Sequence, residues 1–153
     1  MSRTEDILYL ARKFLFVRET KPNHGHWVEL FQLHAGGQPG DSWCAAFVSF
    51  ILAVAYGGYM KAPLPRTMSC DVLLDAGRAA GWLSSVPEVG DVFLYLHNPV
   101  DAHHTGLITE VKDDGTVIGI AGNTSSDGKS SNGDGVYEHA IDTSKIIYVR
   151  YPR

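Results

Sequence analysis

Cys44 stands where a polar turn changes abruptly into a long apolar segment. The turn is Gly40-Asp41-Ser42-Trp43, and the apolar segment covers residues 45–56 and stops at two glycines. This pattern predicts a buried helix with Asp41 or Ser42 as its N-cap. In the first turn of a helix, unpaired N–H groups and the helix dipole lower the pKa of a thiol and favour the reactive thiolate. Most free cysteines are instead small buried hydrophobes, and the local sequence leaves both interpretations open.

A cysteine nucleophile needs a nearby base, and the base needs a third group that orients its ring. His104 is the candidate base, because Gly106 faces the same side of the expected strand and leaves open space there. His103 and His104 are neighbours and face opposite sides of a strand, so at most one of them faces the thiol. The alternative is that His104 is a surface histidine at the end of a strand.

Asn123 is the candidate for the third group. The sequence Asp113-Asp114-Gly115 predicts a hairpin that brings residues 119–123 back alongside residues 104–106. Asn123 is polar at the end of an apolar strand, so its side chain can accept the proton of the second imidazole nitrogen. Cys–His–Asn is a known variant of the catalytic triad. Asn123 fits the start of a turn equally well.

The first half of the chain must supply the helix that carries Cys44. Apolar residues there recur at helical spacing in four segments. We expect helices after a capping box at Ser2-Arg3-Thr4-Glu5 and through Leu15, in a short segment over Trp27–Leu33, from Cys44 to Tyr56, and over Met68–Ala80 before Gly81.

The second half changes to alternating β-branched and aromatic residues, which predict strands. We expect strands at Asp91–His97, His104–Lys112, Thr116–Ala121, Val136–Ile141 and Ile146–Tyr151. Residues 122–135 are rich in Gly, Ser, Asn and Asp and predict a long connection, of a kind that is often functional. Helices followed by an antiparallel sheet are typical of an α+β fold, and residues 1–153 contain no repeat or linker that divides them, so we expect a single domain.

The overall composition excludes several classes of function. The formal charge of −4 and the pI near 5.9 argue against nucleic-acid binding. Two cysteines form at most one disulfide and no cysteine-rich zinc site. The acidic N-terminus predicts no signal peptide, and the longest apolar stretch is too short to insert into a membrane. We expect no cofactor.

The motifs, taken in order, resemble the CHAP domains (cysteine, histidine-dependent amidohydrolases/peptidases) of the NlpC/P60-like cysteine hydrolases. The matching motifs are Trp43-Cys44-Ala45-Ala46-Phe47-Val48-Ser49, Pro87-Glu88-Val89-Gly90-Asp91-Val92, His104-Thr105-Gly106-Leu107-Ile108 and Gly122-Asn123-Thr124. Segments 19–30 and 132–137 also resemble the phage-type branch, so the resemblance covers residues 5–151. It implies a papain-like fold and an endolysin-type amidase or endopeptidase that cleaves amide bonds in bacterial peptidoglycan, without a separate cell-wall-binding domain.

The resemblance also assigns roles to three residues. It implies that Cys44 is the nucleophile, His104 the general base and then acid, and Asn123 the group that orients His104. Many relatives carry Glu two residues before this Asn, but this chain has Ala121, so Asn123 must serve alone. Some relatives bind calcium through acidic residues just before the cysteine. Here residues 38–42 have too few carboxylates for such a site, so we expect no metal.

Three further residues are candidates for substrate binding. Trp43 precedes the nucleophile and either walls the substrate cleft or packs in the core. Glu19 and Asn23 belong to a polar loop motif that either lines the cleft or caps local structure.

Four other residues are expected to be structural. Asp91 is interpreted as a turn or strand-start residue, and Cys70 as a core residue within its helix. His97 and His103 could suggest zinc together with the candidate nucleophile, but they lack a regular ligand spacing.

The family resemblance leaves three uses open. The first is an endolysin that a separate pore protein releases from the cytoplasm to the cell wall in the periplasm. The second is a peptidoglycan-cleaving effector toxin that a secretion system delivers and that a cognate immunity protein inhibits. The third is a non-catalytic module that binds the cell wall. In each case we expect a monomer whose partner is peptidoglycan.

Overall fold

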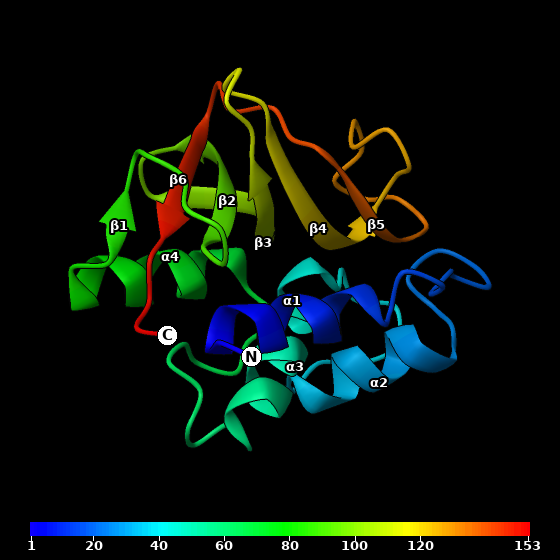
Figure 1. Ribbon diagram of the computed structural model, residues 1–153. Helices are drawn as coiled ribbons and strands as arrows, with labels where there is room; N and C mark the ends of the chain where they lie inside the picture. The colour runs from blue at the N-terminus through cyan, green and yellow to red at the C-terminus, as the bar shows by residue number, and fades with distance from the viewer.

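The computed structural model describes residues 1–153 and shows four helices followed by an antiparallel sheet, which confirms the α+β class (Figure 1). The helices are α1 (Arg3–Arg12), α2 (His26–His34), α3 (Cys44–Tyr56) and α4 (Cys70–Ala80). The strands are β1 (Leu83–Ser84), β2 (Val92–Asn98), β3 (Asp101–Val111), β4 (Val117–Thr124), β5 (Gly135–Ala140) and β6 (Ile146–Val149).

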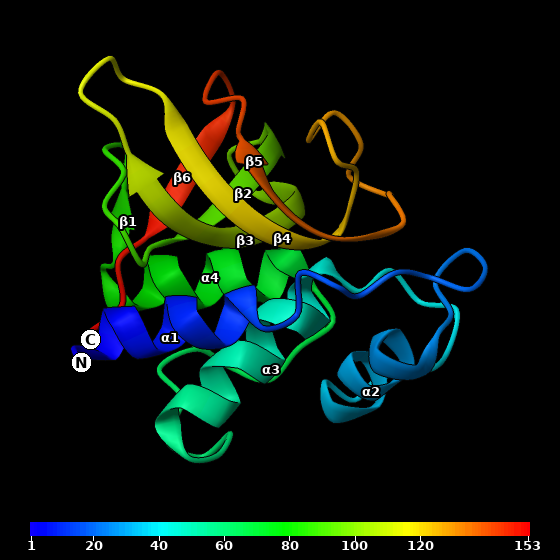
Figure 2. The same ribbon diagram turned by 45° about the vertical axis from the view of Figure 1, so that its right-hand side comes forward.

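The six strands form one curved sheet in the order β1-β6-β2-β3-β4-β5. In Figure 2 the helices gather on one side of this sheet, with α1, α3 and α4 running beneath it. Helix α3 packs against β3 and β4, and α4 packs against β3. The two helices that begin with a cysteine therefore lie under the same central strand.

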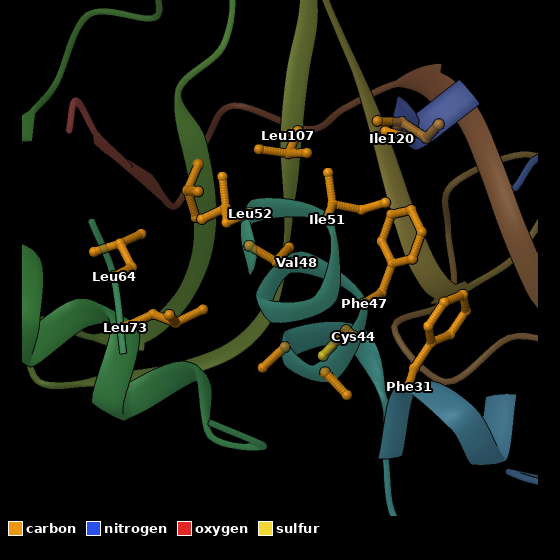
Figure 3. Close-up of a cluster of buried hydrophobic side chains, with 14 of the residues drawn as sticks. Phe31, Cys44, Phe47, Val48, Ile51, Leu52, Leu64, Leu73, Leu107 and Ile120 are labelled. Atoms are coloured by element: carbon orange, nitrogen blue, oxygen red, sulfur yellow. The ribbon is translucent and has the colours of Figure 1, made fainter. Parts of the chain in front are cut away.

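Helix α3 is the centre of the main core. Nine of its thirteen residues are buried, as expected for a helix that is apolar on nearly every side. Figure 3 shows Phe47, Val48 and Ile51 pointing toward Leu107 and Ile120 of the sheet. Because each fully buried side chain of this kind contributes about 1.5–3 kcal/mol, these contacts fix the position of α3 under β3 and β4. No helix in the structure combines the length and the apolar character needed to cross a bilayer.

The helix ends follow local rules that the sequence carries. The predicted capping box of α1 is confirmed, because Glu5 N donates to Ser2 Oγ at 3.2 Å and Ser2 N donates to the Glu5 carboxylate at 2.6 Å. Helix α3 ends at Gly57, whose φ of 79° is left-handed, as the glycine stop predicts. Helix α4 begins at Cys70 rather than Met68, because the Ser69 side chain accepts from Val72 N and caps it.

The strand boundaries differ from the prediction in the second half. Strand β3 begins three residues before His104, and β4 continues through Thr124, so the predicted long connection is reduced to residues 125–134. The alternating pattern fails at His103 because β2 and β3 shift register there: Tyr95 pairs with His104 and Leu96 pairs with Ala102. The hairpin turn predicted at residues 113–115 is present, with Gly115 at a φ of 90°.

Candidate active site

Cys44 is the first residue of α3, as the sequence predicts, but the cap differs from the prediction. The N-cap is Trp43, which gives the helix no side-chain hydrogen bond. Asp41 does not cap the helix because its carboxylate accepts from Gln38 N at 2.9 Å in the preceding turn. The N–H groups of the first turn of α3 are therefore not occupied by a capping side chain, and the backbone of Ala45 contributes to lowering the pKa of the Cys44 thiol.

Cys70 lies directly against the candidate nucleophile. Its sulfur is 3.6 Å from the sulfur of Cys44, both thiols are free, and both residues are buried. The hydrogen bond with Cys70 is the largest cause that lowers the pKa of Cys44, well below the usual value for a thiol. The same bond and burial raise the pKa of Cys70.

The sequence interpretation of Cys70 as a plain core residue is thus incomplete. The residue is buried as expected, but it also contacts the thiol of the candidate nucleophile. One signal pointed in this direction, because the only two cysteines of the chain both stand near the start of a predicted helix. Their proximity is a tertiary contact that no local pattern reports.

His104 lies on β3, close enough to Cys44 to lower the pKa of its thiol further, whereas burial alone would raise it. The imidazole is 1% exposed and lies beside the rings of Tyr95 and Phe93, with centroids 5.6 Å and 6.2 Å away. Neither of its ring nitrogens has a hydrogen-bond partner. The structure therefore brings together the candidate nucleophile and the candidate base, and excludes solvent from the base.

Asn123 lies on the strand beside His104. Strands β3 and β4 are neighbours, and their pairing ends at Leu107 and Ile120, three residues from His104 on one strand and three from Asn123 on the other. Asn123 is fully buried and has a φ of 55°, and neither its side-chain oxygen nor its nitrogen has a partner. No hydrogen bond joins Asn123 to His104 in this structure, so its role as the orienting group stays a prediction.

The surroundings of Ala121 show why no carboxylate shares this site. Ala121 is fully buried in a small apolar cluster that includes Phe93 and Ile108, where an ionised side chain would be costly. The same cluster corrects the interpretation of Gly106. No open space lies above that glycine, because a Cβ there would come within 2.6 Å of the Phe93 ring. Gly106 makes room for an aromatic side chain rather than for substrate.

The loop before Cys44 is held in place by two side chains. Glu19 accepts a hydrogen bond from Trp43 Nε1 at 2.8 Å. Gln32 is fully buried and donates to the backbone oxygens of Asn23 and Asp41, each at 2.8 Å. These bonds tie the segment that precedes the nucleophile to the polar loop that the sequence singled out.

The three residues predicted to bind substrate, Trp43, Glu19 and Asn23, all take part in these hydrogen bonds. Trp43 is fully buried, so of its two predicted roles the structure shows packing in the core and not a wall of the cleft. A Cβ at Gly122 would come within 2.6 Å of its ring, so that glycine lets the indole approach β4. Glu19 is half-buried on the indole N–H, and Asn23 has a φ of 61° with an unpartnered, buried side-chain oxygen.

A cleft of about 580 Å³ borders the candidate site on the side of Tyr95. Its walls include Tyr95, His97 and His103 on one side and Lys129 and Lys145 on the other, whereas Cys44 and His104 do not line it. The rings of His97 and His103 stack with centroids 4.0 Å apart, and burial and then His97 lower the pKa of His103. No group of three or more His, Cys, Asp or Glu side chains is arranged to hold a metal ion.

Asp91 lies directly before β2, consistent with its interpretation as a turn or strand-start residue, and also forms a buried ion-pair network. Its carboxylate is 0% exposed and accepts from Glu88 N at 2.9 Å. Arg150 and Arg153 bind the same carboxylate at 2.8 Å and 3.3 Å. The network joins the start of β2 to the C-terminal residues and takes no part in the cysteine–histidine contact.

Comparison with known proteins gives one family match and one solved structure of limited similarity. The family model of the CHAP domain matches residues 35–123, a span that includes Cys44, His104 and Asn123. No curated protein matches the chain. Among solved structures, N-acetylmuramoyl-L-alanine amidase from Staphylococcus aureus superposes with a TM-score of 0.49 and 13% sequence identity, over 75% of this chain and 32% of that one. The chain thus spans about a third of the length of that amidase.

Proposed function

This chain belongs to the CHAP domain family, and on that basis we propose that it is a thiol hydrolase that cleaves amide bonds in bacterial peptidoglycan. The observation that carries the proposal is the contact at the start of α3. There Cys44 has a strongly lowered pKa and lies near the buried imidazole of His104. A low-pKa thiol beside a histidine is the arrangement that acyl transfer by a cysteine requires.

The reaction begins with the transfer of the Cys44 proton to His104. The thiolate then forms a bond to the carbonyl carbon of the scissile amide, and the electrons of the carbonyl double bond move onto oxygen. Hydrogen bonding from Cys70 and the free N–H groups at the start of α3 favour the thiolate before the attack.

The N–H groups of the first turn of α3 also suit the negative oxygen that forms in this step. They carry no capping side chain, so they can donate to an anion that lies beside Cys44. A cap at Asp41 would have occupied these donors. The absence of the predicted cap thus supports a role for this helix end in stabilising the oxyanion.

Two further stages complete the reaction, collapse of the tetrahedral intermediate and hydrolysis of the thioester. The carbon–nitrogen bond breaks, the amine leaves with the proton held by His104, and a thioester on Cys44 remains. Water gives a proton to His104 and attacks the thioester, which releases the carboxylic acid and the thiolate. We propose that Asn123 orients His104 through these steps, since the two residues lie on the neighbouring strands β3 and β4 and both Asn123 side-chain polar atoms are free of other partners.

The substrate sets the place of action. Peptidoglycan lies outside the cytoplasmic membrane, and we propose that a separate pore or a secretion system delivers the protein to it. We propose an endolysin-type role, in which the catalytic domain acts as a monomer on the cell wall.

Digestion of purified peptidoglycan sacculi tests the proposal. We expect the wild type to release soluble fragments, whereas Cys44→Ser should reduce the rate by about 10⁴-fold or more, because the members of such a site act as a unit. The matched control is His26→Gln, on an exposed histidine of α2. Mass spectrometry of the fragments identifies the cleaved bond as the N-acetylmuramoyl–L-alanine amide, a stem-peptide bond or a cross-bridge. Equal rates for Cys44→Ser and wild type, or no fragments from wild type, would overturn the proposal.

A further inference from the structure

The geometry points to a second function for the thiol pair: we propose that Cys70 is the resolving cysteine of the nucleophile. In this proposal peroxide oxidises Cys44, and Cys70 then closes a reversible Cys44–Cys70 disulfide that switches the enzyme off. The loss of activity rests on the proposed function, whereas formation of the bond depends only on the two thiols.

The distance between the sulfurs suits a disulfide. They lie 3.6 Å apart, so they must approach by about 1.5 Å to reach the bonded length near 2.05 Å. Each cysteine is the first residue of its helix, α3 or α4, where fewer backbone hydrogen bonds hold the residue than in a helix interior. No other cysteine is present, so the pair has no competing partner within the chain.

The two thiols differ in the way that an attacking and a resolving cysteine require. Thiolates react with peroxide and thiols do not. Cys44 lies near His104, a base that can take its proton, and the hydrogen bond with Cys70 and the contact with His104 lower the pKa of Cys44, whereas the hydrogen bond with Cys44 and burial raise the pKa of Cys70. Cys44 is therefore the sulfur that peroxide oxidises, and Cys70 remains available as the thiol.

The disulfide forms in two steps, oxidation of Cys44 and then attack by Cys70. The Cys44 thiolate attacks one oxygen of hydrogen peroxide, the O–O bond breaks, and Cys44 sulfenic acid and hydroxide form. Cys70 sulfur then attacks the sulfenic sulfur and forms the S–S bond, and the sulfenic hydroxyl leaves with the Cys70 proton as water. Peroxide is reduced to two waters after proton uptake, and the two thiols are oxidised by two electrons.

The position of Cys70 also protects the nucleophile. A sulfenic acid that meets more peroxide becomes sulfinic acid, which is not recovered by thiols. A thiol already in contact with Cys44 reacts within the molecule, which favours the disulfide over a second encounter with peroxide. An added dithiol reverses the bond by exchange and restores the free nucleophile.

Peroxide treatment of the full chain tests this proposal, with wild type, Cys70→Ser and Cys70→Ala compared. After quenching, peptide mapping under non-reducing conditions reports the state of each sulfur. Sacculus digestion before and after dithiothreitol reports activity, and each protein is normalised to its own untreated rate. In wild type we expect one linked peptide containing Cys44 and Cys70, loss of nearly all activity, and recovery with dithiothreitol. In both variants we expect sulfinic acid at Cys44 and no recovery.

Wild type that keeps both thiols free, or that accumulates sulfinic acid at Cys44 without a linked peptide, would overturn the proposal. Equal recovery of wild type and Cys70→Ser would also overturn it. Because the peptide map does not depend on turnover, a linked peptide in a protein that never digests sacculi would contradict the proposed function and leave the disulfide established.

Discussion

Two buried polar groups of the sheet region, the carboxylate of Asp91 and the imidazole of His104, differ in their hydrogen bonding. The carboxylate of Asp91 at the start of β2 has three partners: Glu88 N, Arg150 and Arg153. The imidazole of His104 has no hydrogen-bond partner on either nitrogen. His104 lies on β3, four residues before Ile108, whose N–H donates to the backbone oxygen of Asp91. Both side chains are at most 1% exposed, so the contrast is one of bonding and not of burial.

We propose that this difference separates a group that stabilises the fold from groups that take part in the proposed reaction. A buried charge with complete bonding fixes the elements that it joins and has no spare capacity to exchange protons. A buried polar group without partners costs free energy of folding, and it keeps its donor and acceptor sites available for a reaction. His104 and Asn123 belong to the second kind, and Asp91 belongs to the first.

The largest expected effect comes from replacing His104 with Phe. His104→Phe keeps a ring beside Tyr95 but removes the base, so the rate of sacculus digestion should fall about 10³- to 10⁴-fold. The free energy of unfolding should stay the same or rise, because two unpartnered nitrogens are removed from the interior. Digestion assays and urea unfolding measure the two quantities on the same preparation. A variant that unfolds more easily and keeps its activity per folded molecule would place His104 with the structural groups.

Asp91→Ala should show the reverse pattern. It leaves Arg150 and Arg153 without their shared carboxylate, and Arg153 is only 9% exposed. Removing one partner of a buried ion pair costs about 3 kcal/mol or more, so the urea midpoint should fall strongly. The rate per folded molecule should not change, since the network lies apart from Cys44. Arg12→Ala is the control, because it breaks a more exposed pair with Glu138 and should cost less than about 1 kcal/mol.

Asn123→Ala tests whether Asn123 orients the imidazole of His104. If Asn123 orients His104, the rate should fall by about 100-fold, the lower end of what a positioned base contributes. Asn123→Asp retains an acceptor for the imidazole N–H and should lose less activity than Asn123→Ala. An unchanged digestion rate in Asn123→Ala would show that His104 works without it.

The sequence predicts the parts of this contrast that depend on local pattern. The start of α3 at Cys44 follows from the abrupt change to apolar residues, and the strand-start role of Asp91 follows from the preceding glycine. The turn predicted at residues 113–115 joins β3 and β4, the two strands that carry His104 and Asn123.

The predictions that failed have one local cause and two causes that lie in contacts between different segments. Asp41 does not cap α3 because Gln38 N has already taken its carboxylate. Strand β3 was predicted to begin too late, since the register shift at His103 breaks the alternation that marks a strand. The contact of Cys44 with Cys70 joins two helix starts that are 26 residues apart, and neither segment alone contains information about it.

The smallest expected effect concerns the hydrogen bond from Cys70 to Cys44, which makes Cys44 more acidic. As pH falls through the lowered pKa of Cys44, the thiolate is protonated and kcat/KM should fall, which gives the acidic limb of the pH profile. Cys70→Ala removes the largest cause of the lowered pKa, so this limb should move to higher pH. The shift should be about one pH unit, the worth of one hydrogen bond to a charged group. Cys70→Ser retains a donor and should return the limb toward the wild-type position. If Cys70 only fills space, Cys70→Ala would lower the rate equally at every pH and leave the midpoint of the acidic limb unchanged. Cys70 would then be a structural group, as Asp91 is.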